Sequence, residues 1–346
     1  MLARFAIPFF FLMTLVVVPL LLALLCRRLA PRRWWRWMAL AITVAVWAVV
    51  GYGYSVGYEQ MEVHHVEFAS SDLPASFDGY RIVQFSDAHI GTMTGPRRWL
   101  LQRAVDSINA LHPDLIVFTG DMQNVYPDEL PPHIATLRQL KARDGVLAVL
   151  GNHDYAVYQN VHPAIKAQNC EKTKEHLRAM GFDLLLNEHR IIRRDTDSIV
   201  VAGMENWGIA ERMPHEGDVA RTLAGLACQP SAADAQHAAA AGRPSSPFIL
   251  MLQHDPTCWR EHILPECRAQ LTLSGHTHGG QMALLGLSPA SLAYSEWGGM
   301  YREGDRALFV STGLGALIPF RLGMPGEIAV VTLKAAPLQT RRNGKK

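Results

Sequence analysis

Five short apolar segments of this chain each run into a polar motif. The segments have the length of β-strands and are rich in Val, Ile, Leu and Phe. The motifs that follow them are, in order, Asp87-Ala88-His89, Gly120-Asp121, Gly151-Asn152-His153-Asp154, His254 and Gly275-His276-Thr277-His278. A single motif of this kind is often only a turn or a helix cap. Five in one chain predict strands whose ends share one site.

Strands alternate with helical segments in the first half of the chain. Residues 81–85, 115–118 and 146–150 are expected to be strands, and 96–111 and 131–141 have helical spacing with a proline near the start. This alternation predicts an α/β fold with a largely parallel sheet covered by helices. Ligands of such sheets bind outside the carboxyl ends of the strands, which is where the motifs fall.

The second half repeats the arrangement less regularly. Residues 59–78 are expected to form a linker with one edge strand, and 217–247, rich in Ala, Ser, Pro and Gly, a surface insertion that is part marginal helix and part loop. Further strands are expected at 199–202, 248–252, 271–273, 308–310 and 328–333.

Two apolar runs precede these strands. The first, residues 5–26, carries no charge and is long enough to cross a bilayer. It is interpreted as a retained helix and not a signal peptide, because Cys26-Arg27-Arg28 follows it in place of a small-residue cleavage site. The second run, 39–50, reaches a spanning length only with 51–54. Together they predict a transmembrane hairpin.

The short link between the two runs is rich in arginine. Positive residues in short loops stay on the cytoplasmic side, so the rest of the chain is expected outside the cytoplasm, anchored in an inner or cell membrane. The alternative is that the second run lies on the membrane surface, which would leave the domain in the cytoplasm. The arginines are Arg27, Arg28, Arg32, Arg33 and Arg36.

The motif side chains are typical of a transition-metal site. Hard cations such as Ca²⁺ take oxygen ligands, whereas imidazole suits Fe, Ni, Cu and Zn. Asp87 and His89 are alternate residues of an extended chain and point the same way, as do His276 and His278. Asp121 has two carboxylate oxygens and is able to bridge two ions.

Taken together, the motifs resemble the calcineurin-like metallophosphoesterase superfamily over roughly residues 81–333. Residues 275–281 and 313–321 are most similar to its bacterial membrane-anchored phosphodiesterase branch. The resemblance implies a four-layer sandwich, two mixed β-sheets flanked by helices, behind the N-terminal hairpin. The expected organisation is a membrane anchor at 1–58, a metallophosphoesterase domain at 59–336 and a basic C-terminal tail at 337–346.

The resemblance also implies two divalent metal ions, Mn, Fe or Zn, and a role for each motif residue. His153 is implied to face the substrate and protonate the leaving group, and Asp154 to orient and charge His153. The ligands implied for the first ion are Asp87, His89, Asp121 and His278. Those implied for the second are Asp121, Asn152, His254 and His276.

The function expected from these residues is metal-dependent phosphoester hydrolysis by in-line attack of an activated water. We expect a phosphodiester or pyrophosphate substrate, with a lipid-linked one favoured by the membrane anchor. One alternative is a UDP-2,3-diacylglucosamine-type nucleotide-lipid pyrophosphate hydrolase of lipid A metabolism, which the arginine topology disfavours because nucleotide-activated sugars are cytoplasmic. The other is a non-catalytic metal-binding scaffold.

Other features carry less information. The formal net charge of +2 says little about partners, and the lack of a basic stripe interleaved with aromatic residues predicts no nucleic-acid partner. Cys170, Cys228, Cys258 and Cys267 would be permitted to form disulfides outside the cytoplasm, or are free structural thiols. Packing or solvated roles are expected, ahead of roles in substrate or metal binding, for His64, His65, Trp207, Trp297, Tyr301 and Arg321.

Overall fold

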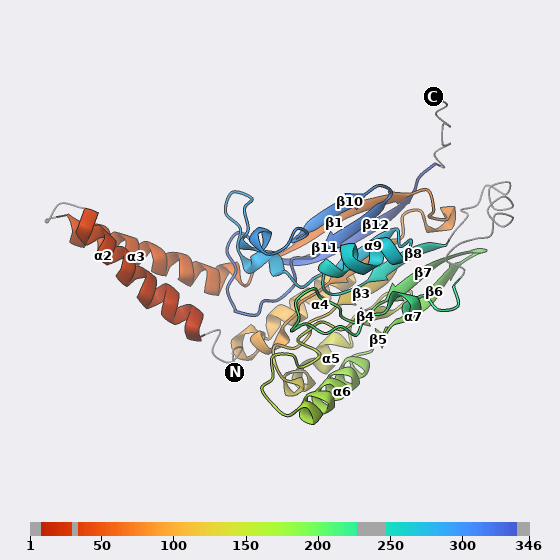
Figure 1. Cartoon of the computed structure of the whole chain (residues 1–346), viewed down its shortest axis with the longest axis horizontal. Helices are drawn as coiled ribbons and strands as arrows, with labels where there is room; N and C mark the ends of the chain where they lie inside the picture. The colour runs from red at the N-terminus through yellow and green to blue at the C-terminus, as the bar shows by residue number, and fades with distance from the viewer. Residues whose placement is uncertain (1–7, 30–33, 227–246, 338–346) are drawn as a thin grey trace.

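The computed structural model describes residues 8–29, 34–226 and 247–337 (Figure 1). Its α-helices are α2 (Val18–Leu29), α3 (Trp35–Tyr52), α4 (Trp99–Ala110), α5 (Ile134–Leu137), α6 (Pro163–Ala179), α7 (Val219–Thr222) and α9 (Leu264–Glu266). Its strands are β1 (Met61–Ser70), β2 (Arg81–Phe85), β3 (Leu115–Thr119), β4 (Val146–Val149), β5 (Asp183–Leu184), β6 (Glu188–Arg194), β7 (Asp197–Gly203), β8 (Phe248–Leu252), β9 (Leu271–Ser274), β10 (Gly299–Glu303), β11 (Arg306–Val310) and β12 (Gly326–Ala335).

The strands form two six-stranded mixed sheets. The first has the order β1-β12-β2-β3-β4-β5, in which β12 runs antiparallel to β2 and the other neighbours are parallel. The second has the order β10-β11-β9-β8-β7-β6, with antiparallel pairs only at its two edges. Every residue of the central strands β3 and β8 is buried, because both faces of each sheet are covered.

Three apolar clusters separate four layers. Between the sheets, Ile82 and Val117 of the first pack against Leu250 of the second. The outer face of the first sheet is covered by α4, α5 and α6, with side chains such as Ile108 at helical spacing on α4. The outer face of the second is covered by α7 and the helical segment around Trp259. The predicted sandwich of two mixed sheets flanked by helices is confirmed.

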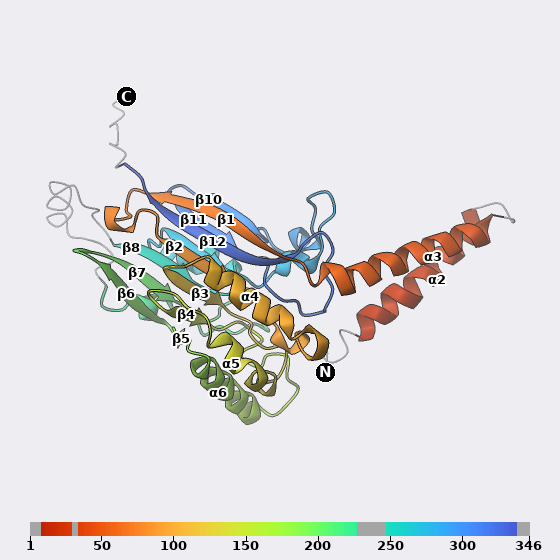
Figure 2. The same cartoon turned by 180° about the vertical axis from the view of Figure 1, so that it is seen from behind.

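Two apolar helices, Pro8–Leu29 and Trp35–Gly57, precede the sandwich as a possible hairpin. They have 22 and 23 residues, so each is roughly 33–35 Å long, enough to cross the hydrocarbon core of a bilayer of roughly 30 Å. Both views show them projecting away from the sheets (Figures 1 and 2). The start of the first helix and the end of the second lie next to the sandwich, and the ends that carry Arg27, Arg28 and Arg36 lie far from it (Figures 1 and 2).

The predicted mixed character of the first sheet comes from β12, which returns antiparallel to β2, and β1 adds parallel to β12 as the predicted edge strand. One local expectation needs correction. The helix expected at 131–141 is a 3₁₀ turn, Pro131–His133, followed by the short α5. In the surface insertion expected at 217–247, the described part contains α7, and residues 227–246 lie outside the described ranges.

Candidate metal centre

The five motifs meet at one edge of the sandwich. Those after β2, β3 and β4 come from the first sheet, and those after β8 and β9 come from the second. The carboxyl ends of these parallel strands point to the same edge, so segments more than 150 residues apart in sequence become neighbours. All seven predicted ligands are brought into one cluster, and His153 belongs to it as well, since donor atoms of His89, Asp121 and His153 lie within 4.8 Å of one another.

Most of the predicted ligands have a left-handed backbone, which is uncommon for residues other than glycine and costs free energy. Such strain persists where the surrounding structure demands it and is frequent at functional sites. The residues and their φ angles are Asp87 (50°), His89 (41°), Asp121 (64°), His276 (74°) and His278 (54°). The backbone of these motifs therefore directs the ligand side chains toward the cluster, and the left-handed conformation costs conformational free energy.

Asp121 lies at the centre of the cluster. Its Oδ2 is 3.3 Å from Nε2 of His254 and 3.8 Å from Nε2 of His89. Its Oδ1 accepts a hydrogen bond of 2.8 Å from the backbone N–H of His153. Gly120 makes this approach feasible: it has a φ of 97°, and a Cβ there would lie 2.6 Å from Nδ1 of His254. The carboxylate is thus placed between two groups of donors.

The first group consists of Asp87, His89 and His278. The Nε2 atoms of the two histidines lie 3.0 Å apart, and Nε2 of His278 is 3.4 Å from Oδ1 of Asp87. One donor atom from each residue falls within a sphere that a metal ion could occupy. Burial, and next the nearby histidine charges, lower the pKa of His89 to about 3, and burial lowers that of His278 as well, so both imidazoles are neutral and available as ligands.

The second group consists of Asn152, His254 and His276. Oδ1 of Asn152 lies 3.1 Å from Nε2 of His254 and 2.8 Å from Nδ1 of His276, and these two nitrogens are 3.2 Å apart. Together with Asp121, the group offers two nitrogens and two oxygens. Such a mixed set fits a transition-metal ion such as Mn, Fe or Zn.

A backbone carbonyl fixes the ring of His254. Its Nδ1 donates to the carbonyl oxygen of Thr119 at 2.7 Å, which turns Nε2 toward Asp121, as is typical of metal-binding histidines. Burial opposes the charged form of His254, but the neighbouring Asp121 carboxylate outweighs it and raises its pKa to about 10. The Asp121 carboxylate therefore favours a positive charge at His254.

The surroundings of His153 differ from the expectation. Asp154 was expected to orient its ring, but Nδ1 of His153 is hydrogen-bonded to the carbonyl oxygen of Asn124. The carboxylate of Asp154 instead accepts backbone N–H groups of Gly151 (3.0 Å) and Asp121 (2.8 Å). Burial, and next the Asp121 charge, raise the pKa of Asp154 to about 7. Asp154 thus holds the loops after β3 and β4 together.

Several residues near the cluster were not singled out from the sequence. Nε2 of His276 lies 3.1 Å from the hydroxyl of Tyr294 and 3.4 Å from Oδ2 of Asp255. The ring of Tyr158 packs on His153 with centroids 4.3 Å apart. Asp255 directly follows a predicted ligand and was detectable for that reason, whereas the two tyrosines carry no motif.

Packing roles are found for three of the residues outside the motifs, Arg321, Tyr301 and Trp207. Arg321 is buried and donates to backbone carbonyls only within its own loop, including that of Gly315. The Tyr301 hydroxyl accepts from the backbone N–H of Trp297 at 3.0 Å, and Trp207 stacks on His215. Among the cysteines, the described thiols of Cys170 and Cys258 are free and buried, and Cys228 lies outside the described residues.

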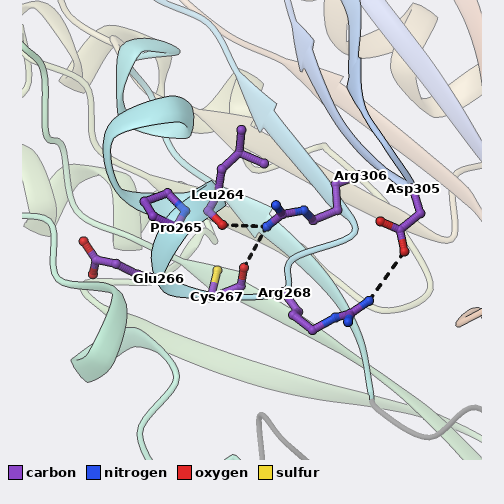
Figure 3. A pocket seen from close by; sticks show the side chains of 7 residues that line it. All are labelled: Leu264, Pro265, Glu266, Cys267, Arg268, Asp305 and Arg306. Atoms are coloured by element: carbon purple, nitrogen blue, oxygen red, sulfur yellow. Dashed lines mark hydrogen bonds and ion pairs between the residues drawn. The ribbon is translucent and has the colours of Figure 1, made fainter.

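A pocket of about 380 Å³ lies elsewhere on the second sheet (Figure 3). Arg306 donates to the carbonyls of Leu264 (2.7 Å) and Cys267 (3.0 Å) there, and Arg268 pairs with Asp305 at 3.5 Å. None of the residues that line this pocket is a predicted ligand, so it is separate from the metal centre.

Known proteins share these features. A family model described as calcineurin-like phosphoesterase matches residues 80–280. The uncharacterized metallophosphoesterase YkuE of Bacillus subtilis is 31% identical over 300 residues, 82% of this chain and 90% of that protein. A transmembrane protein with metallophosphoesterase domain from Danio rerio is 33% identical over 86% of this chain, which spans 62% of that protein's length, less than two thirds.

A third relative is named for its substrate. The UDP-2,3-diacylglucosamine pyrophosphatase LpxG of Chlamydia trachomatis is 27% identical over 75% of this chain and 86% of that protein. With a family model that covers more than half of the chain, and with the five motifs gathered at one edge of the sandwich, this chain belongs to the calcineurin-like phosphoesterases and is a metal-dependent phosphoester hydrolase.

Proposed function

We propose that the chain is a membrane-anchored phosphohydrolase that holds two transition-metal ions and cleaves phosphodiester or pyrophosphate bonds. The observation that carries this proposal is the position of Asp121, whose carboxylate lies between two separate groups of donors. Asp121 with Asp87, His89 and His278 would hold one ion. Asp121 with Asn152, His254 and His276 would hold the other. When bound, such a pair lowers the pKa of a shared water and polarises the phosphate.

His153 is proposed to act on the leaving group. Its Nδ1 is occupied by the Asn124 carbonyl, so Nε2, 4.0 Å from Oδ2 of Asp121, faces the cluster and is the atom that would deliver a proton. A protein nucleophile is not required. Burial raises the pKa of the Cys170 thiol to about 11, which argues against a thiolate in that role.

A lipid-linked substrate is the favoured class. Two apolar helices long enough to span a bilayer support a position of the domain next to a membrane, and the relative LpxG is named for a nucleotide-linked diacyl sugar. The second candidate function is therefore hydrolysis of a nucleotide-lipid pyrophosphate. It requires the domain to face the cytoplasm, whereas the five arginines between the two apolar runs support the opposite side.

The experiment uses the full-length protein in detergent, stripped with a chelator and reconstituted with Mn²⁺. Hydrolysis of bis(4-nitrophenyl) phosphate is measured for the wild type, His153→Ala and a control, His65→Ala, which changes an exposed histidine on β1. We expect His153→Ala to lower kcat by about 10²- to 10⁴-fold, the usual scale for a lost general acid, and His65→Ala to have no effect. Metal content should be unchanged in both variants.

Two results would count against the proposal. Equal activity of His153→Ala and the wild type would remove His153 from the reaction. A wild type that binds metal but hydrolyses neither phosphomonoesters, phosphodiesters nor nucleotide-lipids would favour the alternative of a non-catalytic scaffold.

A further inference from the structure

A second cavity lies between the metal centre and the membrane hairpin. Its volume is about 240 Å³, and its lining is mainly apolar. Pockets that enclose a whole drug-sized ligand measure about 300–1,000 Å³, so this one suits only part of a ligand. The residues that matter for the argument are Phe10, His278, Met282, Leu317, Ile318 and Phe320.

One side of this cavity belongs to the first apolar helix. The ring of Phe10 packs on that of Phe320 with centroids 5.0 Å apart. The second helix is fixed at the same place, because the backbone N–H of Arg321 donates to the carbonyl of Gly53 at 3.0 Å. A Cβ at Gly53 would lie 2.3 Å from the Phe320 ring, so the hairpin and the domain are in close contact there. The cavity therefore lies where the two apolar helices meet the domain.

The opposite side of the cavity belongs to the metal centre. His278 lines the cavity and also lies within 3.4 Å of Asp87 and 3.0 Å of His89 in the first donor group. A ligand whose apolar part occupied the cavity would thus have its adjoining polar part beside the cluster.

The loop that leaves the cavity at Met282 is unusually apolar for a surface. Leu284, Leu285, Leu287 and Leu292 are 74%, 95%, 75% and 92% exposed. In both views the segment around residues 282–293 lies in the part of the domain nearest the hairpin (Figures 1 and 2). Contiguous exposed apolar side chains mark a contact surface, and here the adjacent hairpin supplies the partner, a bilayer.

The backbone of this loop supports the same interpretation. Leu284 and Leu287 exchange two hydrogen bonds of 3.0 Å, closing a tight turn. Its two central residues, Leu285 and Gly286, have φ angles of 53° and 80°, a geometry that favours Asn or Gly at both positions. A leucine in this conformation is strained and, in water, also exposes its apolar side chain. Insertion into the membrane interface would offset the second cost.

We propose that the cavity between Phe10 and His278 is a hydrocarbon-chain subsite and that the loop at 282–293 rests in the membrane interface beside it. The substrate is then an amphiphilic phosphate ester of the bilayer, with its phosphate at the metal centre and the first part of its chain in the cavity. This inference rests on the proposed function.

The test uses the full-length protein in phosphatidylcholine nanodiscs with Mn²⁺ and two substrates that share one leaving group. These are 4-nitrophenyl hexadecyl phosphate, which enters the bilayer, and 4-nitrophenyl ethyl phosphate, which stays in water. Ile318→Asp places a charge in the cavity, and Ile318→Leu preserves its apolar lining. Ile191→Asp is the matched control, an exposed isoleucine on β6.

Each methylene moved out of water strengthens binding roughly fourfold, so losing even two contacts is measurable. We expect Ile318→Asp to lower kcat/KM for the hexadecyl ester by about tenfold or more and to leave the ethyl ester unchanged. Ile318→Leu and Ile191→Asp should behave as the wild type with both esters. An equal effect of Ile318→Asp on both esters, or no effect on either, would overturn the subsite.

A second measurement separates this inference from the proposed function. A non-hydrolysable alkyl phosphate with a photoreactive group on its chain is irradiated in the same nanodiscs, and the labelled peptides are mapped. Labelling of the segments that contain Met282 and Ile318, reduced in Ile318→Asp, supports the subsite even if neither ester is hydrolysed. Ethyl ester hydrolysis with no labelling of the segments that contain Met282 and Ile318 would overturn the subsite and leave the proposed function standing.

Discussion

Arg321 holds together the loop that passes beneath the metal centre. Its guanidinium is buried, and burial lowers its pKa to about 10. Gly313, one of its partners, lies so close to the centre that a Cβ there would be 2.8 Å from Asp87 and 3.3 Å from His278. The carbonyls that accept from the guanidinium are those of Thr312, Gly313, Gly315, Met324 and Pro325.

We therefore expect Arg321→Met to destabilise the domain. Carbonyl groups would be left buried without donors, which costs about 1–3 kcal/mol in the free energy of unfolding. Chemical unfolding, followed by tryptophan fluorescence, measures the free energy of unfolding of the variant and of the wild type. Arg268→Met is the control, since it removes an exposed arginine with one ion pair at 3.5 Å and should change stability by less than about 1 kcal/mol. Equal stability of the two variants would contradict the assigned role.

The individual residues of the candidate site were largely predictable from the sequence. Asp87, Asp121 and His254 each follow a short apolar strand, and the ends of parallel strands meet at one edge. The partner of His153 was not predictable, because Asn124 contributes a backbone carbonyl, which every residue has. The role of Asp154 was missed for a similar reason: it accepts from backbone N–H groups.

Strand β1 joins the hairpin to the first sheet by pairing with β12 along its whole length. A side-chain pair reinforces the contact: Nδ1 of His64 lies 2.6 Å from Oε1 of Glu327. The second oxygen of Glu327 accepts from the backbone N–H of Thr312 at 2.7 Å. The hydrogen bond with Glu327 raises the pKa of His64, and the more distant Glu62 adds to the effect.

This pair predicts a pH dependence of stability. Because the pKa of His64 is higher in the folded state, its stabilising effect is complete below about pH 6.5 and is lost as the pH rises through the folded value. The midpoint of thermal unfolding should therefore fall modestly on raising the pH from about 6 to 8, since His64 is half exposed. The fall should be smaller in His64→Gln and unchanged in His65→Gln. An identical pH dependence of the unfolding midpoint in the wild type and both variants would refute the assigned role of His64.

Elements with a buried face were the ones that the sequence predicted. Strands such as β3 and β8 are buried throughout and were expected within one residue of their bounds. The edge strand β6 was missed because only one of its residues is buried. Helix α6 was missed because its buried residues are few, Cys170, Thr173 and Leu177, and its other residues are mainly polar.

At the scale of the whole molecule, the arginines of the two apolar helices and the metal centre lie at opposite ends of the hairpin. Arg27 and Arg28 end α2, and Arg36 lies in the first turn of α3, at the end remote from the sheets. Arg97 lies at the other end, where its guanidinium stacks 4.0 Å from the ring centroid of Tyr54. If both helices span, the metal centre and the arginine link must lie on opposite sides of the membrane.

The predicted side for the domain is outside the cytoplasm, because arginines in a short loop are costly to translocate and a long domain is not. Two fusions after Lys346 test this: a reporter active only outside the cytoplasm should be active, and one active only inside should be silent. The reverse pattern would place the domain in the cytoplasm and make a nucleotide-lipid the favoured substrate.

The proposed function depends most on two metal ions that share Asp121. Elemental analysis of the full-length protein, stripped and reconstituted with Mn²⁺, Fe²⁺ or Zn²⁺, tests this directly. We predict two ions per chain in the wild type and in His153→Ala, whose ring is given no ligand role, and fewer in Asp121→Ala, which removes the shared carboxylate. A wild type that retains one ion or none, or loss of metal from His153→Ala, would contradict the proposed centre.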